Sequence, residues 1–117
     1  MIIEILQAKI HRALVTNSEL EYEGSIFIDA KILAESGILS YQKVEIYNIN
    51  NGERFATYTV PVNIEGEFCI NGAAARKVQK GDRIIVCAYA SVAIEEAKTH
   101  FPKTLLVGKN NLDISIK

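Results

Sequence analysis

Val44-Glu45-Ile46-Tyr47-Asn48-Ile49, followed by the turn Asn50-Asn51-Gly52 and a second extended run from Arg54 to Val60, carries the strongest structural signal in this chain. The first six residues alternate between apolar and polar side chains, which predicts a strand with one buried face. The Asn-Asn-Gly turn predicts a tight reversal that leads directly into the second run. We therefore expect the fold to be built around an antiparallel hairpin.

Outward from the hairpin, the sequence continues in short extended runs with few helices. The further runs are 2–15, 20–28, 68–70, 83–90, 104–107 and 112–116. Short helices are expected at 29–36, between an Asp29 N-cap and Gly37, at 73–78 and at 91–100. Thr16-Asn17-Ser18 should break the first strand, and Pro61 should close the hairpin. Many short strands, short helices and no linker predict a mainly β, closed or nearly closed small barrel in one domain, residues 1–117.

Composition narrows the class of function. Of the 117 residues 49% are hydrophobic and 23% charged, an ordinary globular balance, and the net charge of −1 argues against nucleic acid or an anionic membrane as a partner. No apolar run approaches the roughly 18 residues of a membrane span. Cys69 and Cys87 lie in apolar runs, which predicts buried thiols in a reducing compartment, hence the cytoplasm. No metal-ligand spacing, phosphate-binding glycine loop or Ser-His-Asp order is present, so no metal is expected.

The pair Gly24-Ser25 offers distinctive chemistry. A serine hydroxyl can attack the preceding carbonyl and shift the acyl group from nitrogen to oxygen, and glycine leaves that carbonyl unobstructed. Elimination of the ester would convert Ser25 into dehydroalanine and then into a pyruvoyl ketone, an electron sink for an amine substrate. The alternative is a turn that opens a strand, the common role of an isolated Gly-Ser pair.

Arg54 and Tyr58 are four residues apart on the second hairpin strand, so they share a face with Cα atoms about 13 Å apart. Arginine offers a planar fork for a carboxylate, and tyrosine a hydroxyl that can give up a proton. Two amphipathic side chains covering a barrel surface are the alternative. Thr57 alternates to the other face, so its participation would require a bulge or a local twist.

Two further groups are candidates for binding an anionic substrate. Lys9 and His11 share a strand face and could present a positive charge and a titratable group, with two solvated side chains as the alternative. Asn71-Gly72, followed by Ala73-Ala74-Ala75, could present free backbone N–H groups at a helix start. A turn capped by asparagine is the alternative there.

Taken together, these segments resemble the aspartate 1-decarboxylase family, whose members are pyruvoyl-dependent. The resemblance rests on an ordered, correctly spaced set of motifs that runs from Met1 to about Pro102 and fades in the last hairpin. The motifs are Lys9-Ile10-His11-Arg12, Tyr22-Glu23-Gly24-Ser25, Asn51-Gly52-Glu53-Arg54-Phe55-Ala56-Thr57-Tyr58 and Asn71-Gly72-Ala73-Ala74-Ala75. Ala56 departs from the family, where a serine is frequent.

The resemblance implies a six-stranded double-psi β-barrel, a homotetramer with active sites between subunits, and a proenzyme that cleaves itself between Gly24 and Ser25. Ser25 would become the covalent pyruvoyl cofactor and form a Schiff base with L-aspartate, giving β-alanine and CO2 for pantothenate and coenzyme A. An accessory maturation protein is a candidate partner. The implied roles are proton donation by Tyr58; substrate binding by Lys9, Arg54, Thr57, Gly72, Ala73 and Ala74; self-processing by Gly24, Ser25, Thr57 and Asn71; and accessory positions at His11 and Tyr22.

Two other functions stay open on the residues alone. One is a non-catalytic small β-barrel binding module in which Gly24-Ser25 is a turn. The other is a small nucleic-acid-binding module that uses Lys9, Arg12, Arg54 and the tyrosines, and the near-neutral charge speaks against it.

Overall fold

The structure is a computed structural model that describes residues 1–117. Nine strands form one sheet in the order β2-β6-β3-β5-β4-β7-β1-β8-β9. The strands are β1 (Ile2–Leu14), β2 (Asn17–Glu19), β3 (Ser25–Asp29), β4 (Lys43–Asn48), β5 (Arg54–Val62), β6 (Phe68–Asn71), β7 (Arg83–Ala93), β8 (Lys103–Val107) and β9 (Ile114–Ile116). The helices are α1 (Ala30–Ser36) and α2 (Ile94–Ala97), with 3-10 helices η1 (Gly72–Lys77) and η2 (Lys109–Asn111).

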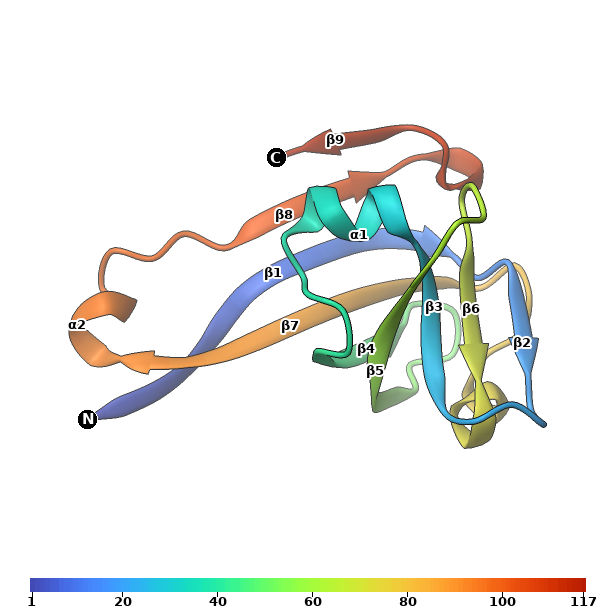
Figure 1. Ribbon diagram of the computed structural model, residues 1–117, viewed down its shortest axis with the longest axis horizontal. Helices are drawn as coiled ribbons and strands as arrows, with labels where there is room; N and C mark the ends of the chain where they lie inside the picture. The colour runs from blue at the N-terminus through green and yellow to red at the C-terminus, as the bar shows by residue number, and fades with distance from the viewer.

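The sheet curls strongly (Figure 1). The chain passes directly from β1, near one end of the strand order, to β2 at the other end. Only Val15 and Thr16 separate β1 from β2, although these strands pair with different partners. The Thr16 N–H donates to the Phe68 carbonyl at 2.9 Å, and the Phe68 N–H donates to Thr16 Oγ1 at 2.9 Å. The expected mainly β class with short helices is confirmed. The ladder has nine strands and does not close, so the six-stranded double-psi barrel stays a prediction from the resemblance.

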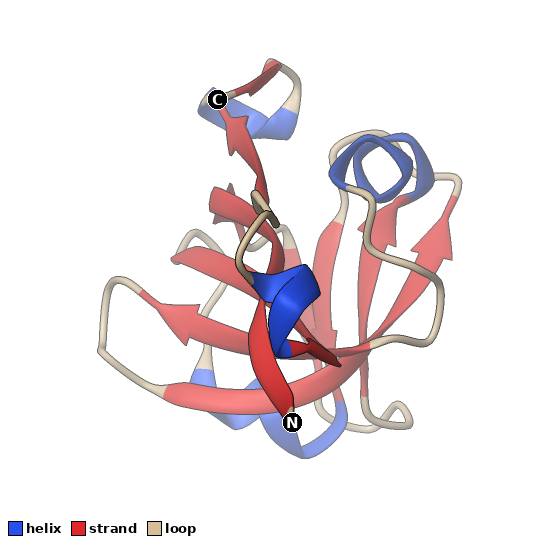
Figure 2. Cartoon of the chain, turned by 90° about the vertical axis from the view of Figure 1, so that its left-hand side faces the viewer, coloured by secondary structure: helices blue, strands red, loops and turns tan.

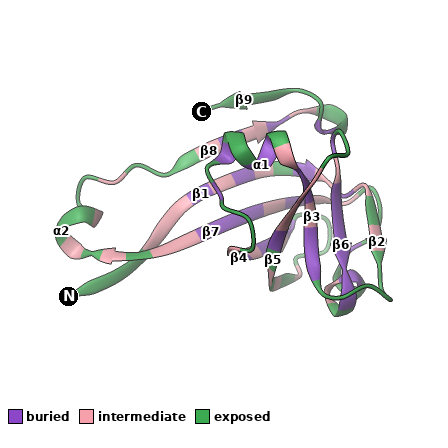
Figure 3. Ribbon diagram, in the orientation of Figure 1, coloured by how far each residue is buried: buried purple, intermediate pink, exposed green.

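The core lies inside the curled part of the sheet. Alternate residues of the strands point inward, so Ile10, Ile28, Ile46, Phe68 and Ile84 are fully buried. Each such side chain contributes about 1.5–3 kcal/mol relative to an exposed one. Figure 3 shows the buried positions gathered in this part of the molecule.

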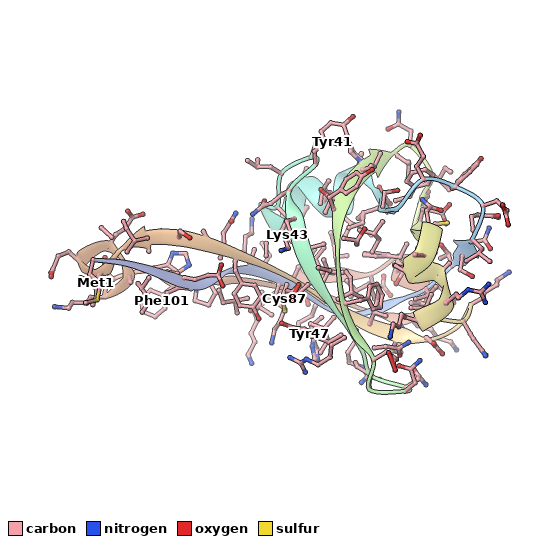
Figure 4. The ribbon with its side chains drawn as sticks, turned by 90° about the horizontal axis from the view of Figure 1, so that it is seen from below. Met1, Tyr41, Lys43, Tyr47, Cys87 and Phe101 are labelled. Carbon is pink, nitrogen blue, oxygen red and sulfur yellow. The ribbon has the colours of Figure 1, made fainter.

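A two-stranded arm extends from the curled sheet (Figure 1). It consists of the first half of β1 and the second half of β7, which pair antiparallel from Ile2 opposite Ala93 inward. The N-terminus and α2 lie at its far end, which Figure 2 views from the front. Met1 and Phe101 sit at this tip and are 92% and 90% exposed (Figure 4). The arm therefore presents apolar side chains to solvent.

The local signals that define the hairpin and the first helix are confirmed. β4 and β5 pair antiparallel without a register shift, and Tyr47 lies opposite Arg54. Asp29 caps α1 by accepting the Lys31 N–H at 2.9 Å. Gly37 ends α1 in the left-handed conformation, with φ 81°.

Two short segments differ from expectation because distant strands recruit them. Asn17–Glu19 does not simply break the first strand but forms β2, which pairs in parallel with β6. Pro61 does not close the hairpin but lies inside β5, opposite Ile28 of β3. It is tolerated there because β4 pairs with β5 no further than Tyr58, so no second strand needs the missing N–H.

Two further boundaries were predicted incorrectly. Ser91 to Ala93 extend β7 instead of opening a helix, because they pair with Ile2 to Glu4 of β1. Only Ile94–Ala97 remains helical in the predicted range 91–100. The strand predicted from Leu20 begins only at Ser25, so the residues before it form a loop. None of the helices has the length and hydropathy that a membrane crossing requires.

Candidate active site

Ser25 begins β3 and lies against the end of β6. The antiparallel pairing places it directly opposite Asn71, and both side chains are buried, at 3% and 0% exposure. The Asn71 Nδ2 donates a hydrogen bond to Ser25 Oγ at 3.1 Å. Gly24, the preceding residue, is exposed in the loop. The bond between Gly24 and Ser25 therefore joins an accessible residue to a buried, hydrogen-bonded hydroxyl.

Gly72 is packed against Gly24, on the N-terminal side of this bond. Its φ is +75°, and a Cβ built on it would lie 2.7 Å from Gly24 Cα and 2.8 Å from Gly24 N. Only glycine combines this backbone conformation with so close an approach. Asn71 makes no capping bond to η1, so its carboxamide serves Ser25 instead of the turn. Next in η1, Ala73 is exposed and Ala74 packs partly against the core.

Ser25 opens onto a cavity of about 470 Å³ that also contains two of the predicted site tyrosines. Tyr58 is 39% exposed, and the Tyr22 ring lies 6.2 Å from that of Phe27, tilted by 49°. The lining residues are Tyr22, Glu23, Ser25, Phe27, Tyr41, Tyr58 and Val60. The cavity thus places the serine and three tyrosine side chains on one surface depression.

Two neighbouring hollows continue this cavity across the outer face of β5 and β4. The first, of about 380 Å³, shares Tyr41 and Tyr58 with it. The second, of about 320 Å³, shares Lys43 with the first and extends to Tyr47 and Tyr89. We call the three together the β4–β5 groove. It leads from Ser25 toward the position of Arg54.

Thr57 is half-buried on β5. It pairs with Val44, a core residue, and no register shift interrupts β4 and β5 between Arg54 and Tyr58. The bulge that would turn it to the Tyr58 face is therefore not present. Thr57 nevertheless lines the middle hollow of the β4–β5 groove beside Tyr58.

Arg54 lies over one tyrosine, which is hydrogen-bonded to a second. Its guanidinium carbon lies 3.8 Å from the centroid of the Tyr47 ring, a cation–π contact. The Tyr47 and Tyr89 hydroxyls lie 2.9 Å apart in a hydrogen bond. That bond, with burial second, raises the pKa of Tyr89, so its hydroxyl stays protonated. Figure 4 shows Tyr47 beside Cys87 on the part of the sheet where the arm leaves it.

Lys9 and His11 lie on β1, beyond β7 from Arg54. Lys9 is opposite Cys87 on one side and Thr104 on the other. His11 has a buried Nδ1 without a hydrogen-bond partner. Burial, with the positive charges of Lys9 and Arg12 next, lowers the pKa of His11. Neither residue lines the cavity at Ser25, so one chain holds the predicted site as two separate groups.

Sequence reasoning missed Tyr47, Tyr41 and Lys43. A signal for Tyr47 was present, because a hairpin centred between Asn50 and Asn51 pairs Tyr47 with Arg54 across the strands. No comparable signal marks Tyr41, which lies outside the strands and reaches the groove through the fold.

Fold and site together define a small, mainly β protein with a buried serine at the head of a groove lined largely by tyrosines. The family model described as aspartate decarboxylase matches residues 1–113, which extends the similarity beyond Pro102. Similar curated proteins, all named aspartate 1-decarboxylase, come from Campylobacter jejuni (53% identity over 111 residues; 95% of this chain, 88% of the relative), Caldicellulosiruptor saccharolyticus (52% over 112; 95% and 88%) and Bdellovibrio bacteriovorus (49% over 111; 95% and 89%). The chain belongs to the aspartate decarboxylase family, and with it to the lyases.

Proposed function

We propose that this chain is a proenzyme that cleaves itself between Gly24 and Ser25, and that the mature enzyme removes the α-carboxylate of L-aspartate to give β-alanine and CO2. The β-alanine would serve pantothenate and coenzyme A synthesis. The observation that carries the proposal is the hydrogen bond of 3.1 Å from Asn71 to the buried Ser25 hydroxyl, at the head of a cavity that also holds Tyr58. The family name supports the substrate.

The cleavage consists of three balanced steps. Ser25 Oγ bonds to the Gly24 carbonyl carbon, the peptide C–N bond breaks, and the hydroxyl proton passes to the nitrogen, which leaves an ester. Loss of the Ser25 Cα proton and rupture of the Cβ–O bond release the Gly24 carboxylate and leave dehydroalanine. Addition of water and release of ammonia then leave a ketone at residue 25. The products are chains of residues 1–24 and 25–117.

The residues around position 25 fit a pyruvoyl group. Gly72 has no Cβ to fill the space beside Gly24, and the cavity of about 470 Å³ accommodates a small amino acid. When present, this group supplies a ketone that reacts with the substrate amine and draws electrons from the breaking bond. Asn71 and the start of η1 would hold it in place. Side chains of the protein bind the substrate and donate the proton.

The groups next to Ser25 have distinct roles in the proposal. The Tyr58 hydroxyl donates a proton to the substrate carbon that loses CO2. Thr57 also assists the self-cleavage. Gly72, Ala73, Ala74 and Thr57 line the space for the substrate, and Gly72 lets the substrate come close to the backbone. Tyr22 is an accessory residue that covers the cavity beside Phe27.

Arg54 and Lys9 bind the substrate carboxylate in the proposal, and His11 is an accessory residue beside them. Because these cations do not line the cavity at Ser25 of their own chain, we infer that neighbouring subunits complete each other's sites in a homotetramer. The apolar tip of the arm supports assembly, since Met1 and Phe101 are almost fully exposed. A cytoplasmic location and an accessory maturation protein are further parts of the proposal.

The reaction is tested with aspartate that carries heavy carbon in one carboxylate. Purified, fully processed enzyme should release labelled CO2 from aspartate labelled in the α-carboxylate. The same enzyme should release unlabelled CO2 and form labelled β-alanine when only the side-chain carboxylate is labelled. Ser25→Ala is the matched control and should release no CO2 from either sample. Labelled CO2 from the side-chain carboxylate would contradict the proposed reaction, and an uncleaved chain under all conditions would favour a binding module.

A further inference from the structure

A second hydrogen bond lies behind the one between Asn71 and Ser25. Cys69 and Asn71 are two residues apart on β6 and therefore share a face, opposite Phe27 and Ser25 of β3. The Cys69 thiol donates to Asn71 Oδ1 at 3.2 Å, and Asn71 Nδ2 donates to Ser25 Oγ at 3.1 Å. Cys69 and Asn71 are both buried, so water does not compete for these groups.

The thiol gives the Asn71 carboxamide a preferred orientation. The oxygen and the NH2 group of a carboxamide have nearly the same shape, so hydrogen-bond partners decide which of them faces a neighbour. A protonated thiol is a donor and only a weak acceptor, so it favours the oxygen of Asn71. Burial, and then the carboxylates of Glu67 and Glu19, raise the pKa of Cys69 to about 11, which keeps the thiol protonated at neutral pH.

This orientation determines what Ser25 Oγ meets. With the NH2 group of Asn71 facing it, Oγ accepts a hydrogen bond, and its own proton stays free to leave. The same N–H stabilises negative charge that develops on Oγ as it attacks the Gly24 carbonyl. In the flipped carboxamide the oxygen would face Ser25, hold its proton and repel that charge.

We infer that Cys69 is a positioning residue for self-cleavage, which acts by turning the Asn71 carboxamide so that its NH2 group faces Ser25. The inference rests on the proposed cleavage at Gly24–Ser25. The step concerned is the first one, in which the Oγ–carbon bond forms, the peptide C–N bond breaks, and the proton moves from oxygen to nitrogen. No other reactant takes part.

The test compares Cys69→Ala with Cys69→Ser in the full chain. The two side chains differ by one hydroxyl, and only serine retains a donor for Asn71 Oδ1. Cleavage is followed by intact mass from freshly purified precursor. Cys69→Ala should slow cleavage about threefold to tenfold, the range expected for one lost hydrogen bond. Cys69→Ser should restore most of the rate.

Controls separate positioning from stability. Cys87→Ala removes the other buried thiol, which makes no bond to Asn71, and should cleave at the unmodified rate. Each Cys69 change is also placed in Ser25→Ala protein, where unfolding in urea is measured without cleavage. If Cys69→Ala does not fold, Cys69→Val serves as the donor-free variant.

The outcomes distinguish this inference from the proposed function. Cleavage of the donor-free variant at the unmodified rate, or equal slowing by alanine and serine, overturns the role of Cys69 and leaves the proposed function intact. Failure of the unmodified chain to cleave under all maturation conditions overturns the proposed function itself. Slowing by alanine with recovery by serine supports the inference.

Discussion

Gly72→Ala should damage both the fold and the self-cleavage, because Gly72 meets two separate constraints. Its φ of +75° lies in the left-handed region, which costs a residue with a side chain about 1–2 kcal/mol. The new Cβ would also meet backbone, 2.7 Å from Gly24 Cα and 3.1 Å from the Tyr22 carbonyl oxygen. Overpacking of this kind costs about 1–3 kcal/mol. We therefore expect a total loss of about 2–5 kcal/mol.

Gly52→Ala is the matched control, because Gly52 has a φ of +78° but an added Cβ would meet nothing within 4 Å. It should lose only the backbone part, about 1–2 kcal/mol. Both changes are measured by urea unfolding in Ser25→Ala protein, and cleavage is followed in chains that retain Ser25. Cleavage should slow markedly in Gly72→Ala, because the residue that carries the attacked carbonyl must move. Equal unfolding free energies for the two variants, with normal cleavage in Gly72→Ala, would refute the reasoning.

Three other changes test separate parts of the site. The Tyr58→Phe chain should cleave itself normally. Its kcat for decarboxylation should fall by about a hundredfold to ten-thousandfold, the usual contribution of a positioned proton donor. An unchanged kcat would show that Tyr58 is not the proton donor. Tyr89→Phe loses the hydrogen bond of 2.9 Å that holds Tyr47 in place beneath Arg54. The KM for aspartate should therefore rise about threefold to tenfold with little change in kcat. A fall in kcat alone would argue against this role of Tyr89. Burial lowers the pKa of His11 from its ordinary value of 6.5. As the pH falls below about 6.5, the imidazole therefore takes up a proton in the unfolded chain before it does so in the folded chain, and the folded state loses stability. His11→Gln in uncleaved Ser25→Ala protein should flatten this loss in unfolding experiments, and an identical pH profile would contradict it.

Local chemistry made the hairpin and the first helix predictable. Alternating side chains and an Asn-Asn-Gly turn define β4 and β5 within a few residues, and the same hairpin implies the pairing of Tyr47 with Arg54. Asp29 and Gly37 mark the ends of α1 because capping needs only neighbours in sequence.

Long-range pairing explains what the sequence did not reveal. Asn17–Glu19 is polar and turn-like, yet it becomes a strand because β6 lies alongside it. Nothing in the spacing of Ser25 and Asn71 shows that they face each other, and their connection came from the family resemblance. Cys69 was predicted only as a buried thiol, which the structure confirms. Its bond to Asn71 becomes meaningful once Ser25 is seen opposite.

The most direct test of the account is the intact mass of the purified chain after prolonged incubation, compared with Ser25→Ala. Self-cleavage should give two chains, residues 1–24 with a free carboxylate and residues 25–117 with a ketone at the new end. Their summed mass should equal that of the precursor plus one water and minus one ammonia, and Ser25→Ala should stay whole. A single uncleaved chain that nevertheless converts aspartate into β-alanine would contradict the account at its centre.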